Sequence, residues 1–298
     1  MDEAPDMGSV LERWLDAAWA MAAQERTVGV EGADVRYRGW GLDAPVDRPG
    51  LIFVHGFMAH ARWWDHIAPH FADRFRVAAT NLTGMGDSDR RPAYSRRQYA
   101  REILAVARDA GMERVTIVGH SFGSVSSLYA AKSAPDLVRH VVVIDADVFR
   151  AEDDGAASRH SGEASPPTAE RRYASRDEAL ARYRLVPPGL WPNARILDYL
   201  ARYSVRETDG GWGWKFDPEI SRQATKERIR DELRGVPVPS SFIHGGDSEV
   251  VGEEEIANFR AHAPGCRGVV TVPLSHHHIM IEQPVGLVAA LNGILESL

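Results

Sequence analysis

A serine stands at the centre of Gly-His-Ser-Phe-Gly at positions 119–123, which matches the pattern G-x-S-x-G. The apolar run 115–118 comes directly before this segment, and a helix-like pattern at 122–134 follows it. A turn that leads so sharply from a strand into a helix strains its central residue and requires very small residues two positions to either side. We therefore predict that Ser121 is lifted clear of a sheet, where its hydroxyl can attack a carbonyl carbon.

Attack on a carbonyl leaves negative charge on its oxygen, and preorganised backbone N–H groups are suitable donors to that charge. The N–H of Phe122 would lie at the amino end of the predicted helix, where the helix dipole favours an anion. A second donor is expected from the loop after the apolar run 51–54, which begins His-Gly-Phe at 55–57. The N–H groups of Phe57 and Phe122 are therefore the predicted oxyanion hole.

Three adjacent histidines, His276, His277 and His278, follow the apolar run 269–272 near the end of the chain. A histidine in the loop after the last strand can act as general base for a serine that precedes it in the chain. The three could also be a metal site, but consecutive side chains rarely point to one centre and no further ligand cluster is evident. We therefore expect no metal and no other cofactor.

Strand-like and helix-like segments alternate along most of the chain and must position these groups. A period-two pattern at 28–37, interrupted by Glu-Gly at 31–32, predicts a hairpin. Helix-like patterns cover 96–110 and 122–134. Further strands are expected at 51–54, 75–79, 115–118, 141–144, 241–244 and 268–272. Alternation of this kind predicts an α/β fold, with a mainly parallel sheet that helices cover on both faces.

The alternation breaks once, over residues 146–236. This stretch begins with a polar run of small residues and continues with helix-like pieces around 175–183 and 193–203. It carries equal numbers of basic and acidic residues, so it provides no net field that would select anionic substrates. We predict an inserted helical cap, or lid, at 146–236, on a core formed by residues 26–145 and 237–298.

Residues 1–25 are predicted to form a separate amphipathic helix. Leucine, tryptophan and alanine side chains between Leu11 and Ala22 fall on one stripe of that helix. Packing on the main domain is the simplest use of such a stripe. A homodimer contact, or a flap over the entrance to the active site, are the alternatives.

Composition and charge exclude several classes of partner. The 298 residues carry a formal net charge of −7, which offers no electrostatic footprint for nucleic acid or an anionic membrane. The acidic amino terminus does not resemble a signal peptide, and no apolar run approaches the length of a membrane span. The single cysteine, Cys266, cannot form an internal disulfide, so a reducing compartment, the cytoplasm, is expected.

Several motifs together resemble the α/β-hydrolase superfamily, over nearly the whole chain. His-Gly-Phe at 55–57 is similar to the oxyanion loop of that family, and residues 81–88 are similar to its D-L-x-G-x-G-x-S loop, with asparagine in the first position. Members place the catalytic histidine five residues before an acidic residue and seven before a proline, which matches His277 with Glu282 and Pro284. The resemblance implies an eight-stranded, mostly parallel sheet flanked by helices, in the serine-nucleophile branch that carries a helical cap.

The resemblance leaves two places for the acid of a catalytic triad. The usual place is the loop after the seventh strand, which holds Asp247 and Glu249. The family spacing G-x-x-D lands on Ser248, which cannot be an anion, when it is counted from Gly245, and on Glu249 when it is counted from Gly246. The other place is the end of the sixth strand, which Asp145 occupies. Either strand end can bring a carboxylate to Nδ1 of His277. We predict that Asp145 is the acid, with Glu249 and Asp247 as the alternatives.

A serine nucleophile disfavours the haloalkane dehalogenase and epoxide hydrolase branches, whose chemistry needs a carboxylate nucleophile. The resemblance leaves ester or lactone hydrolysis, amide hydrolysis, and carbon–carbon bond hydrolysis of a vinylogous diketone. We predict a hydrolase of small-molecule carboxylic esters or lactones that works through an acyl-enzyme, because esters make the fewest demands on the cap. A small-molecule receptor that keeps the triad without turnover is the alternative outside enzymes.

Overall fold

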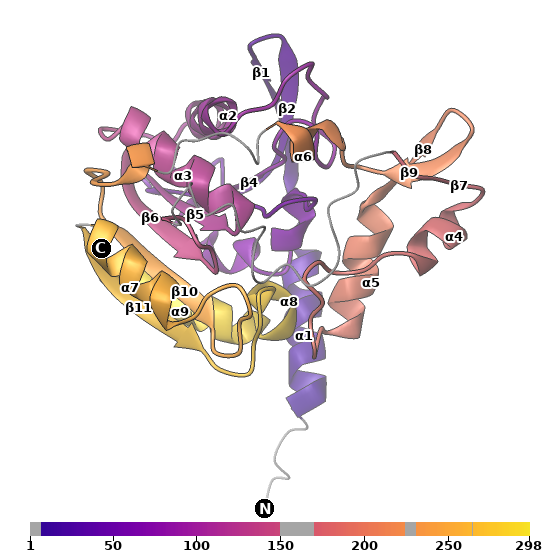
Figure 1. Cartoon of the computed structure of the whole chain (residues 1–298). Coiled ribbons are helices and arrows are strands. Elements are labelled where there is room, and N and C mark those ends of the chain that lie inside the picture. Colours follow the sequence, from indigo (N-terminus) through magenta and orange to yellow (C-terminus); the bar gives the residue numbers. More distant parts are fainter. Residues whose placement is uncertain (1–6, 150–169, 224–230, 264) are drawn as a thin grey trace, which may run out of the picture.

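An eight-stranded sheet forms the centre of the protein, as the computed structural model in Figure 1 shows. The structure describes residues 7–149, 170–223, 231–263 and 265–298. The strands follow the spatial order β1-β2-β4-β3-β5-β6-β10-β11. Their bounds are β1 Gln24–Val30, β2 Ala33–Trp40, β3 Gly50–Val54, β4 Arg76–Thr80, β5 Val115–His120, β6 Val138–Ile144, β10 Ser240–Gly245 and β11 Cys266–Val272.

Most neighbouring strands of this sheet are parallel. The hairpin β1–β2 and the pair β2–β4 are antiparallel, whereas all neighbouring pairs from β4 to β11 run in the same direction. The carboxyl ends of the parallel strands therefore share one edge of the sheet, and the loops that follow them meet there. The predicted α/β fold with a mostly parallel eight-stranded sheet is confirmed.

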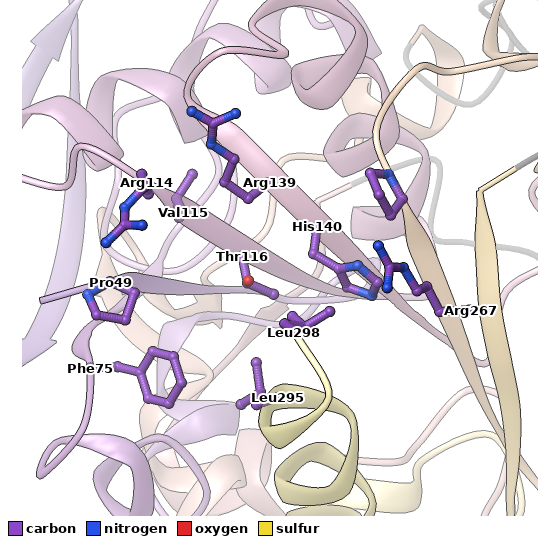
Figure 2. Close-up of a pocket in the computed structure, with 11 residues that line it drawn as sticks. Pro49, Phe75, Arg114, Val115, Thr116, Arg139, His140, Arg267, Leu295 and Leu298 are labelled. Atoms are coloured by element: carbon purple, nitrogen blue, oxygen red, sulfur yellow. The ribbon is translucent and has the colours of Figure 1, made fainter.

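A pocket opens at the opposite edge of the sheet, where β5 and β6 begin (Figure 2). Val115 and Thr116 of β5 and Arg139 and His140 of β6 contribute to its wall. Strand β5 runs from this edge towards Ser121, which follows its other end. The pocket is therefore remote from the predicted nucleophile and does not hold the predicted chemistry.

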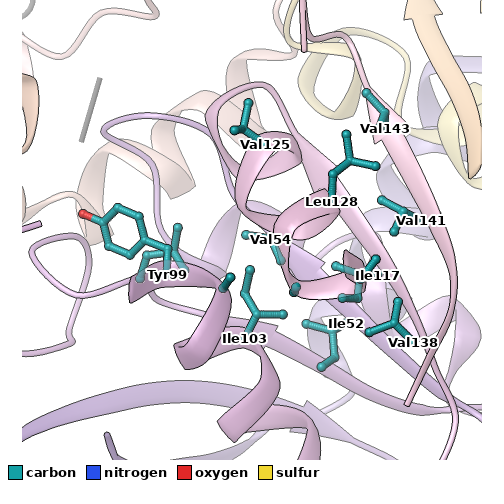
Figure 3. Packing of buried hydrophobic residues seen from close by; sticks show 14 of the residues in the cluster. Ile52, Val54, Tyr99, Ile103, Ile117, Val125, Leu128, Val138, Val141 and Val143 are labelled. Atoms are coloured by element: carbon teal, nitrogen blue, oxygen red, sulfur yellow. The ribbon is translucent and has the colours of Figure 1, made fainter. Parts of the chain in front are cut away.

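Helices cover both faces of the sheet. The helices of the core are α1 Met7–Ala20, α2 Arg96–Asp109, α3 Phe122–Ser133, α7 Glu253–His262, α8 Ile279–Glu282 and α9 Pro284–Glu296, with short 3-10 turns η1 Ala61–Trp64, η2 Ala68–Phe71 and η3 Asp231–Leu233. Ile52 and Val54 of β3 belong to the apolar core beneath α2 and α3, part of which Figure 3 shows. Leu51 and Phe53 belong to a second core with α1 and α9. Successive residues of a strand thus alternate between two cores, which explains why all of β3 is buried.

Residues 170–223 form a layer of helices and strands beside the central sheet (Figure 1). They hold helices α4 Arg176–Ala181, α5 Ala194–Tyr203 and α6 Glu219–Arg222, and strands β7 Arg172–Tyr173, β8 Val205–Thr208 and β9 Gly211–Trp214. The strands form a separate antiparallel sheet in the order β7-β9-β8. The cap region was predicted to be helical, so these strands are a difference from the prediction. The polar run at 152–167, which the prediction placed at the start of the cap, lies outside the described residues.

The apolar stripe of α1 packs against the rest of the protein. Leu15 is fully buried, and Trp14 stacks on His70 with ring centroids 4.2 Å apart. Trp19 stacks in the same way on Tyr199 of α5, with centroids 5.0 Å apart. Helix α1 therefore joins the core to the cap region, and its stripe is occupied within this chain.

Candidate active site

Ser121 occupies the turn between β5 and α3 in a backbone conformation that residues with side chains rarely adopt. Its φ is 49° and its ψ is −116°. A Cβ atom added to Gly119 would lie 2.8 Å from Cα of Ser124, and one added to Gly123 would lie 2.6 Å from the carbonyl oxygen of His55. Both glycines are therefore needed for the turn to close, which is the physical reason for the G-x-S-x-G pattern.

The loop between β11 and α8 brings His277 to the serine. Nε2 of His277 lies 3.0 Å from Oγ of Ser121, and its Nδ1 lies 2.8 Å from Oδ1 of Asp145. The backbone carbonyl of His277 accepts a hydrogen bond from Nε2 of His120 at 3.0 Å, which holds the loop against the end of β5. Ser121, His277 and Asp145 thus form one continuous hydrogen-bonded row.

Asp145 follows β6 directly, and its carboxylate is buried. Its Oδ2 accepts a hydrogen bond from the N–H of Gly245 at 2.8 Å, and Oδ1 accepts one from Oγ of Ser248 at 2.8 Å. Its φ of 44° lies in the left-handed region, so the surrounding contacts must hold it there. These donors fix the carboxylate in the orientation that faces Nδ1 of His277, where it can select the tautomer with hydrogen on Nδ1.

The alternative acids lie in the loop after β10. Among the described residues, Asp145 is the carboxylate that is hydrogen-bonded to His277. The backbone N–H of Asp247 donates to the carbonyl of Ser275, and one carboxylate oxygen of Glu249 is buried without a hydrogen-bond partner among the described residues. The structure therefore brings Asp145 to the histidine and not Asp247 or Glu249.

Replacing Asp145 with asparagine should lower kcat by about 10⁴. The amide keeps the shape of the side chain, but it carries no charge and favours the wrong tautomer of His277. Steady-state rates on an ester that the wild-type protein cleaves would measure the effect. Asp247→Asn and Glu249→Gln are matched controls that should keep most of the activity. Near-full activity of Asp145→Asn beside an inactive control would instead place the acid in the loop after β10.

The two residues of the predicted oxyanion hole lie side by side. Phe122 is the first residue of α3, so its N–H is one of the helix's unpaired donors, and Phe57 lies in the loop after β3. Their rings are 5.3 Å apart, and the ring of Phe216 packs edge-on against Phe57 at 5.1 Å. The close approach of the His55 carbonyl to Gly123 brings this loop to the start of the helix. The oxyanion hole formed by the N–H groups of Phe57 and Phe122 stays a prediction.

Several histidines around the hydrogen-bonded row are buried. Burial lowers the pKa of His55 to about 4, and its two nitrogens bond to the carbonyl of Gly56 and the N–H of Leu82. Burial also holds the pKa of His120 and that of His278 well below the usual range, since a buried imidazolium loses its hydration. These three imidazoles are therefore neutral near pH 7.

His120, His277 and His278 form a cluster that the sequence analysis missed. Each offers one ring nitrogen, and the three nitrogens lie within 4.8 Å of one another. The adjacent His277 and His278 do face a common region, contrary to the expectation for consecutive side chains. His120 is 157 positions away from His277, so only the fold reveals the group. No local sequence signal could have identified it.

A buried carboxylate joins the histidine loop to the cap region. Oε2 of Glu282 accepts a hydrogen bond from the backbone N–H of His276 at 2.6 Å. Oε1 accepts from the N–H groups of Leu190 and Trp191 at 3.0 and 3.3 Å. A Cβ on Gly189 would lie 2.9 Å from the same oxygen, so a glycine allows the chain to pass this closely. We name this contact the Glu282 junction.

Comparison with known proteins agrees with this fold. The esterase Rv0045c of Mycobacterium tuberculosis is 27% identical over 271 residues, which cover 87% of this chain and 85% of that protein. The 2-(acetamidomethylene)succinate hydrolase of Mesorhizobium japonicum is 26% identical over 257 residues, which cover 84% of this chain and 88% of that one. The crystal structure of Rv0045c matches with a TM-score of 0.70 at 23% identity, over 99% of this chain and 100% of that chain. A family model described as the alpha/beta hydrolase fold matches residues 49–284, and because this match spans most of the sequence, the chain belongs to the alpha/beta hydrolase fold family.

Proposed function

We propose that the chain is a serine hydrolase that cleaves small-molecule carboxylic esters or lactones through an acyl-enzyme intermediate. The observation that carries the proposal is the hydrogen-bonded row of Ser121, His277 and Asp145 at a strained turn. Membership of the hydrolase fold family and similarity to a protein named as an esterase support it. Ser121 is the nucleophile, His277 the general base, and Asp145 the acid that orients the base.

Acylation begins when Oγ of Ser121 attacks the carbonyl carbon of the ester. Nε2 of His277, 3.0 Å from that oxygen, takes the hydroxyl proton as the new C–O bond forms. The carbonyl π electrons move to the carbonyl oxygen, and the N–H groups of Phe57 and Phe122 donate to this oxyanion. The tetrahedral intermediate then collapses, the bond to the alkoxy group breaks, and His277 returns the proton to the departing alcohol.

Water completes the reaction along the same route. His277 takes a proton from a water molecule, whose oxygen attacks the acyl carbon. As the second intermediate collapses, the bond between the acyl carbon and Oγ of Ser121 breaks, His277 returns the proton to Oγ, and the carboxylic acid leaves. Asp145 accepts the hydrogen bond from Nδ1 throughout and stabilises the imidazolium that forms at each proton transfer. A lactone would follow the same steps and leave as a hydroxy acid.

The aromatic cluster beside the nucleophile turn favours an apolar substrate group. Phe57 contacts both Phe122 and Phe216, with ring centroids 5.3 and 5.1 Å apart. Aromatic faces and edges bury large apolar areas and offer few hydrogen bonds. We therefore propose that the acyl or alcohol part of the substrate that lies against this cluster is apolar.

The cellular compartment and the oligomeric state of the protein are also matters of proposal. The cysteine Cys266 is free, which suits the reducing conditions of the cytoplasm. No helix in the described ranges is long and apolar enough to cross a bilayer. We propose a cytoplasmic protein whose partner is a small-molecule substrate. A homodimer stays a prediction from the sequence.

Turnover of a substrate panel separates this function from its alternatives. We expect the wild-type protein to release p-nitrophenol from p-nitrophenyl acetate and to react with an active-site fluorophosphonate, one label per chain. Esters and lactones should give the highest kcat/KM in a panel that also contains an amide and a vinylogous diketone. A higher kcat/KM for the diketone would assign carbon–carbon bond hydrolysis. Tight binding without turnover of any member would assign a receptor.

A further inference from the structure

Three histidine rings surround the reacting end of the hydrogen-bonded row. His120 ends β5, and His277 and His278 come from the loop before α8. The centroid of the His277 ring lies 4.8 Å from that of His120 and 5.0 Å from that of His278, and the rings of His120 and His278 are 5.8 Å apart. All three residues are buried. This histidine cluster therefore lies in a part of the protein that is shielded from bulk water.

The hydrogen bonds of the cluster decide which nitrogens keep a free lone pair. Nε2 of His120 lies 3.0 Å from the carbonyl oxygen of His277, and Nε2 of His278 lies 3.1 Å from that of Pro187. A carbonyl oxygen only accepts, so both Nε2 atoms carry hydrogen and both Nδ1 atoms carry the lone pair. His277 donates from Nδ1 to Asp145, so its lone pair is on Nε2. Each ring thus offers one metal-ligating nitrogen.

Two of these nitrogens are buried and accept no hydrogen bond from the described residues. Nδ1 of His120 and Nδ1 of His278 have no hydrogen-bond partner among the described residues. A Cβ added to Gly56 would lie 2.8 Å from Nδ1 of His120 and 3.5 Å from Cβ of Ser121, so this nitrogen lies on the side of the nucleophile. A buried acceptor without a partner destabilises the folded state, because it has lost its hydrogen bond to water. A ligand that takes both lone pairs would remove that cost.

The outer contacts of the cluster also match those of metal sites. Histidines that bind a metal usually donate their other ring N–H to a carboxylate or a backbone carbonyl, which fixes the tautomer and the ring orientation. His277 donates to the carboxylate of Asp145, and His120 and His278 donate to backbone carbonyls. All three rings therefore already have the outer partner that a metal ligand needs.

We propose that His120, His277 and His278 form an inhibitory site for Zn²⁺. Neutral imidazole suits zinc, and three protein ligands with a fourth position open to water are one of its common arrangements. Zn–N bonds of about 2.0–2.1 Å place the ligand nitrogens about 3.4 Å apart, so nitrogens that lie up to 4.8 Å apart must approach by as much as about 1.4 Å. Ser121 lies beside the open fourth position because its Oγ is 3.0 Å from Nε2 of His277.

Zinc at this site would compete directly with catalysis. The lone pair on Nε2 of His277 takes the proton of Ser121 during acylation in the proposed function. A lone pair that is shared with a metal cannot accept that proton. Bound Zn²⁺ should therefore stop acylation while it leaves the fold unchanged, and its removal should restore the rate.

Calorimetric titration with Zn²⁺ tests the site independently of turnover. We expect the tag-free wild-type protein to bind one Zn²⁺ per chain, and Zn²⁺ to inhibit ester hydrolysis reversibly, with recovery after EDTA. His278→Gln keeps a side-chain amide that can donate to the carbonyl of Pro187 but lacks the ring lone pair, and it should bind Zn²⁺ at least about 10-fold more weakly. His120→Gln is a second variant of the same design. Ser121→Ala should bind Zn²⁺ as the wild type does, although it has no turnover.

His140→Gln is the matched control. His140 is a buried histidine of β6 whose Nε2 lies 2.9 Å from Oγ of Ser241, outside the cluster. This variant should keep both the Zn²⁺ affinity and the metal-free rate of the wild type. Absence of stoichiometric Zn²⁺ binding by the wild type would overturn the proposal. So would an unchanged affinity in folded His278→Gln and His120→Gln, or faster ester hydrolysis with Zn²⁺ bound.

Discussion

Alanine in place of Ser121 should lower kcat for ester hydrolysis by about 10⁶. The change removes the oxygen that forms the acyl bond, and binding and the oxyanion donors then leave only a small residual rate. The backbone turn should survive, because serine and alanine both carry a Cβ at the φ of 49°. Initial rates at high protein concentration measure the loss, and a thermal unfolding curve should confirm an unchanged fold.

Ser126→Ala is the matched control for that experiment. Ser126 lies in the same helix, and its buried hydroxyl has no hydrogen-bond partner among the described residues. This control should keep the wild-type rate and the fluorophosphonate label, whereas Ser121→Ala should lose both. Stoichiometric labelling of Ser121→Ala would mean that another residue is the nucleophile.

Removal of the His277 ring should be nearly as severe as loss of the serine, about 10⁶ in kcat. Loss of Nε2 removes the group that lies 3.0 Å from the Ser121 hydroxyl and takes its proton. The two residues act as a unit, so Ser121→Ala combined with His277→Ala should be hardly worse than either change alone. Rates of the two single variants and the double variant would measure this non-additivity.

The neighbouring histidines supply the controls for His277. The ring of His276 faces the carboxylate of Glu282, and that of His278 bonds to the carbonyl of Pro187. His276→Ala and His278→Ala should therefore reduce the rate far less than His277→Ala. Losses of equal size would show that the histidine loop has a different register from the one that the Glu282 and Pro284 spacing indicates.

The nucleophile turn could be predicted from sequence because its physics is local. Gly119 and Gly123 lie only two positions from the residue they serve, and the strand and helix that flank the turn adjoin it directly in the sequence. The structure adds the atoms that a larger side chain would strike, Cα of Ser124 and the carbonyl of His55. The expectation of eight strands followed from the family resemblance, and no residue pattern predicted their order in the sheet.

The predicted triad acid, Asp145, shows what residue spacing alone cannot predict. The family spacing counted from Gly245 pointed at Ser248, and the structure shows that this hydroxyl donates to the carboxylate of Asp145 at 2.8 Å. The count therefore identified a residue that contacts the acid, while the carboxylate itself is that of Asp145, at the end of β6. A contact between residues 103 positions apart depends on strand pairing, which no local pattern contains.

The cap region was the weakest part of the sequence prediction. Its strands span only two to four residues, too short for a period-two pattern to emerge. One signal was available, because Asp209 and Gly210 form the two-residue turn between β8 and β9, and Asp-Gly is a strong hairpin signal. Side-chain clusters such as the three histidines had no comparable signal.

The Glu282 junction would couple the position of segment 189–191 to the order of the proposed general base, His277. Withdrawal of segment 189–191 would take the donors of Leu190 and Trp191 away from a carboxylate that is buried. A buried charge that loses its donors must recruit water or move, and either change loosens its hold on the N–H of His276, which precedes His277 in the chain. By thermodynamic linkage, ordering of the histidine loop would also favour this position of segment 189–191, and the reverse would hold equally. The state in which segment 189–191 contacts Glu282 would then also be the state in which His277 is ordered for reaction.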